Sequence, residues 1–167
     1  QAAALTGQNE LSSLHILFPS DEDCAALREA GFMFRESVQF HWHNRGYANL
    51  DGFLAEMSQQ KRKKLKQDRK KTQQAGVVFR WLQGEAIDDS ALEFFYECYC
   101  RTYYEHGNAP YLNREFFALL RQSMAQNMLI VLAEQNGQPI ACALNIRSKD
   151  RLYGRYWGST QVVSGLH

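Results

Sequence analysis

Apolar and polar positions are most informative between Met128 and Gly158, where they predict three consecutive antiparallel strands. The first apolar run, Leu129–Glu134, is followed by Asn136-Gly137. This dipeptide between apolar runs indicates a tight hairpin, because both central residues of a type I′ turn need positive φ. The chain then returns along Ile140–Ile146 and runs out along Leu152–Gly158. The first two strands are apolar at successive positions, so we expect both faces of this sheet to be covered.

The third strand carries an unusual alternation of residue types. A strict period of two predicts one face with Leu152, Gly154, Tyr156 and Gly158, and the other with Tyr153, Arg155 and Trp157. Glycine weakens a strand and often marks the close approach of a ligand or of another backbone. An arginine between two aromatic residues must reach an acid or a ring face, or bind an anionic ligand. This strand is therefore our first candidate for a functional site.

Upstream, the pattern predicts short strands and helices in turn. The predicted strands are Ser13–Phe18, Phe32–Trp42 and Val77–Leu82. The predicted helices span about 21–30, Leu50 to Ala75, a segment that begins with the capping box Ser90-Ala91-Leu92-Glu93, and a segment capped by Asn113. Residues 1–12 show no period and are expected to be a frayed end. From Val77 the order is strand, helix, helix and three antiparallel strands, which places the chain in the α/β (α+β) class.

Composition adds a strong local charge to this picture. The 167 residues carry a net charge of only +1, and 45% of them are hydrophobic, enough to bury a core in one domain or in pieces of two. The basic residues are concentrated within 61–71, at Lys61, Arg62, Lys63, Lys64, Lys66, Arg69, Lys70 and Lys71. Because Leu65 is the one apolar residue among them, we expect this half of the predicted helix to face water or an anionic partner.

Four scattered cysteines without a Cys-x-x-Cys pair favour free thiols in a reducing compartment. No apolar run approaches the ~20 residues of a membrane span, and no signal peptide is visible. These features favour the cytoplasm. The chain begins at Gln1 rather than at a methionine, which favours a piece of a longer gene product.

Few residues suggest chemistry by themselves. His41 and His43 lie on the same side of a predicted strand, where they could form half a metal site, act as an acid/base pair, line an acceptor cleft or make structural hydrogen bonds. No third ligand lies nearby in the sequence, so we predict no metal site. Tyr99, Tyr103 and Tyr104 fit core packing or a stacking platform. Dinucleotide-binding, P-loop, zinc-protease and nucleophile-elbow motifs are absent from the sequence.

Several ordered motifs resemble the FemAB-like branch of the GNAT acyltransferase superfamily. They are Ser13-Leu14-His15 with Leu17-Phe18-Pro19, Gln39-Phe40-His41-Trp42, Asn44-Arg45-Gly46-Tyr47, Lys61-Arg62-Lys63, Pro110-Tyr111-Leu112 with Phe116-Phe117, Ala141–Asn145 and Leu152–Gly158. Together they span about residues 13–167. The resemblance implies a GNAT-like, largely antiparallel sheet flanked by helices, and an N-acyltransferase that moves an acyl or aminoacyl group to an amine.

The resemblance also suggests residues and ligands. As catalytic candidates we take His41, His43, Tyr111, Arg155 and Tyr156, and as donor-binding candidates Tyr153, Gly154, Trp157 and Gly158. We expect no permanently bound cofactor, and acyl-CoA or aminoacyl-tRNA as the donor substrate. Two alternatives remain open: a nucleic-acid or tRNA-binding module that uses the basic residues 61–71, and a scaffold without catalysis.

Members of the Fem group resemble two GNAT-like modules in tandem. Read in this way, residues 1–56 resemble the tail of a first module, 57–76 a basic bridging helix, and 77–167 the front half of a second module. The chain would then be incomplete at its C-terminus as an acyltransferase. Leu152–Gly158 would lie at a sheet edge, and we expect self-association through that edge or coverage of it by a strand from residues 13–42.

Overall fold

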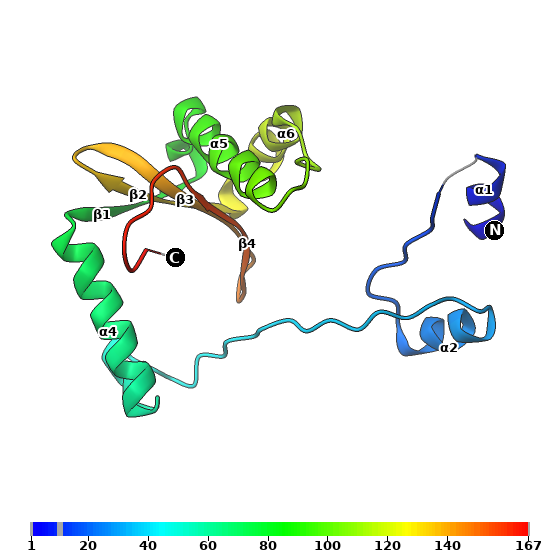
Figure 1. Cartoon of the computed structure of the whole chain (residues 1–167), viewed down its shortest axis with the longest axis horizontal. Coiled ribbons are helices and arrows are strands. Elements are labelled where there is room, and N and C mark those ends of the chain that lie inside the picture. Colours follow the sequence, from blue (N-terminus) through cyan, green and yellow to red (C-terminus); the bar gives the residue numbers. More distant parts are fainter. Residues whose placement is uncertain (1, 10–11, 167) are drawn as a thin grey trace. The chain divides into compact units, whose positions relative to one another are not determined.

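The computed structural model describes residues 2–9 and 12–166, and the chain forms two compact units, Gln1–Gly46 and Tyr47–His167. Figure 1 shows the elements of both units. Each unit is described by itself below. No helix in the described ranges is long and apolar enough to cross a membrane.

The first unit contains two helices, α1 (Ala2–Gln8) and α2 (Asp21–Glu29). The prediction of a frayed end was wrong for α1, although Gln1, Glu10 and Leu11 lie outside the described residues. The helix predicted over about 21–30 is confirmed, and a capping box begins it, because the Ser20 side chain accepts a hydrogen bond from the backbone N–H of Asp23. The strands predicted over 13–18 and 32–42 were wrong, since the chain is extended there but pairs with no neighbouring strand among the described residues.

The second unit begins with two helices, α3 (Leu50–Ala55) and α4 (Gln59–Gln74). The prediction of one helix from Leu50 to Ala75 was therefore wrong. Helix α3 ends at Ala55, with Glu56 as its C-cap. The Ser58 side chain accepts a hydrogen bond from the N–H of Lys61, which starts a new helix. A serine inside an apparently continuous helical pattern thus acts as a cap.

A four-stranded antiparallel sheet follows, in the order β1-β2-β3-β4. Its strands are β1 (Val77–Gln83), β2 (Met128–Gln135), β3 (Gln138–Arg147) and β4 (Leu152–Ser159). The predicted hairpin is confirmed: Asn136 and Gly137 have φ of 53° and 77° and connect β2 to β3. The mixed α+β class and the antiparallel meander are confirmed with it.

Helices α5 (Asp89–Glu105) and α6 (Arg114–Met124) cover one face of this sheet (Figure 1). Short 3-10 turns, η1 (Gly84–Ala86) and η2 (Ala125–Asn127), join the helices to β1 and β2. The predicted cap at Asn113 is confirmed. The capping box expected at Ser90 was wrong, because Asp88 is the cap and accepts hydrogen bonds from the N–H of Ala91 and the hydroxyl of Ser90.

The main core lies between these two helices and the sheet. Phe95, Tyr99 and Phe117 from the helices pack against apolar residues of the central strands, and all three are about 1% exposed. Aromatic contacts such as that of Phe95 with Phe117, with ring centroids 4.9 Å apart, tie the two helices together. The inner residues of the candidate site described below belong to this core.

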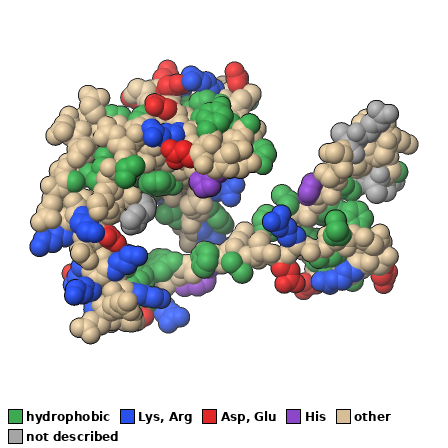
Figure 2. Space-filling view, in the orientation of Figure 1, with side chains coloured by type: hydrophobic (Ala, Val, Ile, Leu, Met, Phe, Trp, Pro, Cys, Tyr) green, Lys and Arg blue, Asp and Glu red, His purple; other side chains and the backbone are tan. Residues whose placement is uncertain are grey.

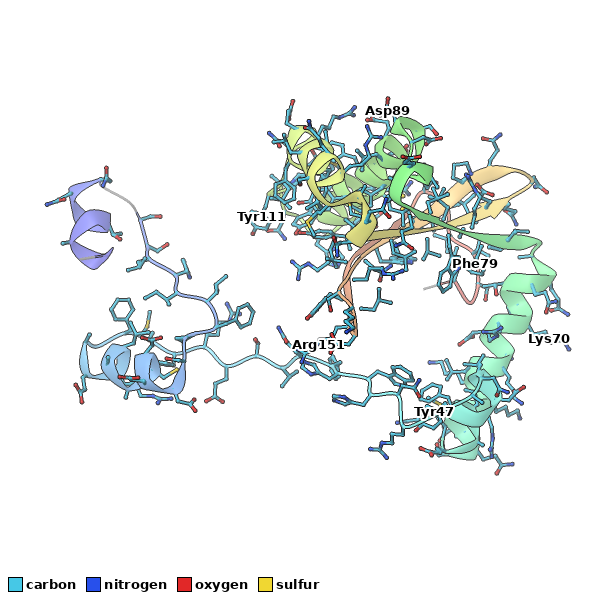
Figure 3. All side chains as sticks on the ribbon, turned by 180° about the vertical axis from the view of Figure 1, so that it is seen from behind. Tyr47, Lys70, Phe79, Asp89, Tyr111 and Arg151 are labelled. Carbon is cyan, nitrogen blue, oxygen red and sulfur yellow. The ribbon has the colours of Figure 1, made fainter. Side chains whose placement is uncertain are left out.

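The opposite face of the sheet is only partly covered, so the prediction of two covered faces was half right. At one end, Val77, Ala133 and Ala141 are buried beneath Val163 and Leu166 of the C-terminal segment. Elsewhere on this face large aromatic side chains remain exposed, namely Phe79, Trp81 and Trp157. Figure 3 shows Phe79 on the side of the sheet away from α5 and α6.

Candidate active site

Four tyrosine rings meet where the end of α5, the loop before α6 and strand β4 come together. We call Tyr99, Tyr103, Tyr111 and Tyr156 the tyrosine cluster. The ring centroids lie 5.5 Å apart for Tyr111 and Tyr103, 4.7 Å for Tyr103 and Tyr99, and 4.9 Å for Tyr99 and Tyr156. The structure therefore connects two of our candidate residues, Tyr111 and Tyr156, through a chain of rings.

Tyr99 fixes the geometry of this cluster. It lies one helical turn before Tyr103, so the two side chains share a face of α5. Its ring is buried, and its hydroxyl oxygen accepts a hydrogen bond of 3.1 Å from the backbone N–H of Leu112. Because Tyr111 precedes Leu112 in the loop after α5 (Figure 3), this bond also holds the exposed Tyr111 in place.

The cluster keeps one of its phenols protonated. Burial is the largest cause that raises the pKa of Tyr103 to about 12, followed by its hydrogen bond with Tyr99 and the neighbouring phenols of Tyr156 and Tyr111. An ordinary tyrosine hydroxyl is already neutral at pH 7, and the raised pKa keeps that of Tyr103 neutral well into alkali. Such a group can donate a proton or a hydrogen bond, but it is a poor general base.

Strand β4 contains an irregularity beside the cluster. Leu144 pairs with Tyr156, whereas the next residue of β3, Asn145, pairs with Gly154, which leaves Arg155 as an extra residue in a β-bulge. A bulge of this kind leaves backbone groups outside the regular ladder. The chain thus departs from the regular ladder at Arg155, next to the tyrosine cluster.

The bulge overturns the predicted alternation of β4. Tyr153 lies opposite Ile146 and Tyr156 lies opposite Leu144, so both tyrosines share the face covered by the helices. Trp157 lies opposite Ala143 and points to the other face. A strict period of two failed because one inserted residue shifts all positions before it to the opposite face.

The two glycines of β4 have different surroundings. A Cβ atom at Gly158 would lie 2.4 Å from the carbonyl oxygen of Cys98, so this glycine allows the close approach of α5. The Thr102 hydroxyl, which lies 3.0 Å from the carbonyl oxygens of Cys98 and Trp157, bridges the same contact. At Gly154 the nearest side-chain atom would be 3.7 Å away, which leaves room above this residue.

Arg155 is exposed at the bulge. Its guanidinium carbon lies 5.6 Å from the ring centroid of Tyr156, and the described residues offer it no ion-pair partner. The sequence left three partners open for Arg155: an acid, a ring face or an anionic ligand. The structure shows the contact with a ring face. The cation also remains accessible to an anionic ligand.

The two candidate histidines lie in the first unit. Their ring centroids are 6.3 Å apart, and the His41 Nε2 atom lies 3.4 Å from the side-chain oxygen of Gln39. The described ranges contain no group of three His, Cys, Asp or Glu side chains that could hold a metal ion. The structure therefore brings together Tyr111, Arg155 and Tyr156, and describes His41 with His43 as a separate pair.

The basic residues of α4 form a second candidate surface. The prediction that they are helical and exposed is confirmed, and Figure 2 shows Lys and Arg side chains gathered over this helix. Lys66 lies 3.7 Å from Asp51, and Arg62 donates a hydrogen bond to the carbonyl of Ala55. The other six have no ion pair with a described residue: Lys61, Lys63, Lys64, Arg69, Lys70 and Lys71.

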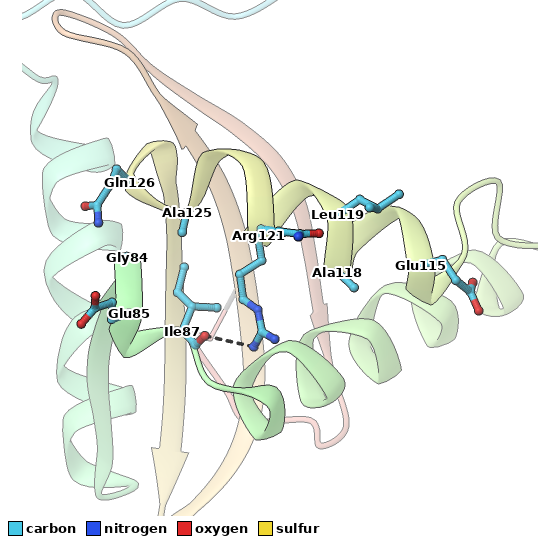
Figure 4. Close-up of a pocket in the computed structure, with 10 residues that line it drawn as sticks. Gly84, Glu85, Ile87, Glu115, Ala118, Leu119, Arg121, Ala125 and Gln126 are labelled. Atoms are coloured by element: carbon cyan, nitrogen blue, oxygen red, sulfur yellow. Dashed lines mark hydrogen bonds between the residues drawn. The ribbon is translucent and has the colours of Figure 1, made fainter.

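Two open grooves lie on the outer side of the helices. The larger, of about 790 Å³, runs between α6 and η1, where Arg121 donates a hydrogen bond to the carbonyl of Ile87 at 3.2 Å (Figure 4). The other, of about 770 Å³, follows α5 and includes Tyr96, Cys100 and Tyr104. Neither includes a member of the tyrosine cluster, although Tyr96 contacts Tyr99 at a centroid distance of 6.0 Å.

Sequence reasoning missed two features of this site. It did not assign a positioning role to Tyr99, although the spacing of Tyr99 and Tyr103 already placed both on one helix face. It also missed the bulge, for which Gly154 inside a strand was the available signal.

Comparison with protein families identifies the chain's family. Residues 1–167 match the FemAB-like family, which is described as peptidoglycan biosynthesis/recognition. No curated protein matches the chain.

Proposed function

Because the chain belongs to the FemAB-like family, we propose that it takes part in N-acyl transfer, in which an acyl or aminoacyl group passes from an activated donor to an amine. The observation that supports this most directly is the bulge at Arg155 beside the tyrosine cluster. The family description suggests an amine of a peptidoglycan precursor as the acceptor.

The proposed reaction balances without a bound cofactor. The amine nitrogen attacks the donor carbonyl, a C–N bond forms, and the C–S bond of a thioester or the C–O bond of an ester breaks. The amine loses a proton and the leaving thiolate or alkoxide gains one. The protein supplies orientation of the two substrates, hydrogen bonds to the developing oxyanion, and groups that move these protons.

We assign roles by the surroundings of each residue. A backbone N–H at the bulge donates to the carbonyl oxygen of the donor. Gly154 pairs with Asn145 and opens on the face away from the helices, so it takes no part in this scheme. Tyr111 or Tyr156 at the surface of the cluster donates a proton to the leaving group. The ring of Tyr103 packs against that of Tyr111. Arg155 contacts a phosphate of the donor, since acyl-CoA and aminoacyl-tRNA both carry phosphates.

The remaining candidates take subsidiary places in this scheme. Tyr153 shares the face of Tyr156 and lines the donor arm, whereas Gly158 is occupied by its contact with α5 and Trp157 lies on the other face. His41 and His43 lie in the first unit and have no assigned role in this scheme. We also propose the cytoplasm as the compartment, because all four cysteines are free.

Amide formation is the direct test. The protein is incubated with acetyl-CoA, or with alanyl-tRNA, and with a lysine-containing peptide as amine, and the product is detected by mass spectrometry. We expect Tyr156→Phe to lower kcat at least tenfold, and Tyr104→Phe, which alters an exposed tyrosine outside the cluster, to leave it unchanged. Equal rates for the two variants would remove the cluster from the mechanism, and no product with either donor would leave the scaffold alternative.

A second function is supported by α4. Six exposed cations without ion pairs on one helix fit a polyphosphate such as the backbone of an RNA duplex. Binding of a tRNA should weaken with salt, and replacing Lys63, Lys64, Lys70 and Lys71 by Gln should reduce the slope of log K against log salt by about 0.9 for each lost phosphate contact. Lys149→Gln with Arg151→Gln is the matched control, because these cations lie outside α4.

A further inference from the structure

The two edges of the sheet differ in how they are protected. At β4, the bulge at Arg155 interrupts the edge, and the second half of the strand is tied to α5 through Gly158. Bulges are a known means of blunting edge strands. Strand β1 pairs with β2 without a register shift from Val77 to Gln83, and it contains no proline, glycine or lysine. The unprotected edge is therefore β1, not β4.

The outer side of β1 is also free and apolar. No described residue besides those of β2 makes a backbone hydrogen bond to β1. Val78 is 63% exposed on the helix side of the sheet, and Phe79 and Trp81 are 48% and 70% exposed on the other side. An exposed, regular and apolar edge of this kind is a template for pairing with another strand.

The sequence of β1 is complementary to itself. In an antiparallel pair centred on Arg80, Phe79 of one copy faces Trp81 of the other, and Val78 faces Leu82. Along a strand, every second residue directs its N–H and C=O towards the free edge. The two members of each pair have residue numbers that are both odd or both even, so the edge-facing groups of one copy lie opposite those of the other. Two aromatic pairs then form on the open face of the sheet.

Charges at this edge agree with the same arrangement. Arg80 would face its own copy, but its guanidinium is already paired with Glu134, with N–O distances of 2.8 and 3.1 Å. The like-charge contact between the two Arg80 side chains is thus neutralised within each copy.

We propose that β1 is a self-association edge, at which a second copy of the chain adds its own β1 in antiparallel orientation to make a continuous eight-stranded sheet. Both copies then present α5 and α6 on the same side, since the two-fold axis is perpendicular to the sheet. An interface built around one strand pair lies at the small end of protein interfaces, and we expect a dissociation constant in roughly the micromolar range.

Sedimentation of the purified chain over a concentration series tests this edge. The expected mass rises from 19.3 kDa towards about twice that value. Phe79→Lys with Trp81→Lys places like charges opposite each other and should raise the dissociation constant at least about tenfold. Phe79→Lys with Trp81→Glu places opposite charges in register and should restore the dimer, now in a salt-sensitive form.

The control is Trp157→Lys, which adds the same charge as Trp81→Lys alone, on the same face but on β4. It should leave the dimer intact. Circular dichroism checks that each variant is folded, and Trp81→Lys alone, at the most exposed of these positions, replaces the double variant if that one unfolds. A monomer at every concentration, a dimer lost in Trp157→Lys, or a folded charge-swap variant that stays monomeric would each overturn the proposal.

Discussion

The hydroxyl oxygen of Tyr99 accepts a hydrogen bond from the backbone N–H of Leu112, 13 residues further along the chain. This bond joins the inner face of α5 to the loop that carries Tyr111, and it lies at the edge of the core. The position of an exposed candidate residue therefore depends on a buried one.

Replacing Tyr99 by Phe tests this dependence. The ring remains in the core, but the Leu112 N–H loses its acceptor, and we expect the free energy of unfolding to fall by about 1 kcal/mol. Amide hydrogen exchange at Leu112 should become faster. Tyr104→Phe is the control, because Tyr104 is 65% exposed and lies outside the cluster. Unchanged exchange at Leu112 in Tyr99→Phe would contradict the anchoring role.

The two glycines of β4 provide a matched pair of substitutions. Gly158→Ala forces a Cβ atom to within 2.4 Å of the Cys98 carbonyl oxygen, so β4 and α5 must separate. We expect a loss of about 1–3 kcal/mol in urea unfolding. Gly154→Ala meets no atom closer than 3.7 Å and should change stability by less than about 0.5 kcal/mol. Similar losses in both variants would show that the strand, rather than its contact with α5, requires glycine.

The raised pKa of Tyr103 predicts a loss of stability in alkali. A phenol with a pKa of about 12 in the folded chain and about 10 in the unfolded chain is ionised first in the unfolded state. The contribution of Tyr103 to the free energy of unfolding is therefore complete below about pH 10 and is lost as pH rises towards 12. Buried Cys98, whose pKa is also raised to about 12, adds to this loss.

The contribution of Tyr103 is isolated by comparing the wild-type chain with Tyr103→Phe. From pH 8 to about 11.5 the unfolding free energy of the wild type should fall relative to that of Tyr103→Phe, because only the wild type carries the Tyr103 phenol. In a pH titration followed by phenolate absorbance, the variant should lack the one tyrosine of the wild type that ionises near pH 12. Parallel stability curves would argue against a perturbed phenol at this position.

Arg155 should act on the donor rather than on the chemical step. In an active preparation, Arg155→Gln is expected to raise KM for a phosphate-bearing donor by about threefold to tenfold, with little change in kcat, because it removes one exposed charge-assisted contact. Arg151→Gln, a nearby exposed cation paired weakly with Asp150, is the control. A selective fall in kcat would assign Arg155 to the transition state instead.

The features that sequence predicted best are those with a local cause. Asn136-Gly137 specifies its hairpin through the φ angles that it tolerates, and Ser20 and Asn113 specify helix starts through their own hydrogen bonds. The break between α3 and α4 had such a cause in Ser58, but the surrounding helix-favouring residues concealed it.

Features that depend on distant partners were not predictable in the same way. Residues 32–42 alternate as a strand does at Val38, Phe40 and Trp42, yet a strand also needs a neighbour for its hydrogen bonds, and these side chains are exposed. The tyrosine cluster likewise needs α5, a loop and β4 to meet. The sequence predicted each part of that site, but the bulge that aligns Tyr153 with Tyr156 follows from the pairing of β3 with β4.

The bulge at Arg155 also determines how the sequences of relatives should be aligned. In a relative that lacks one residue here, β4 would be regular, and the residues on both sides of the gap would keep their partners in β3 and their faces of the sheet. An alignment that moved the gap by a few positions would then equate a residue facing α5 with one facing away from it. Substitution patterns in β4 should accordingly be compared separately on the two sides of Arg155, each side being registered on its own partners in β3.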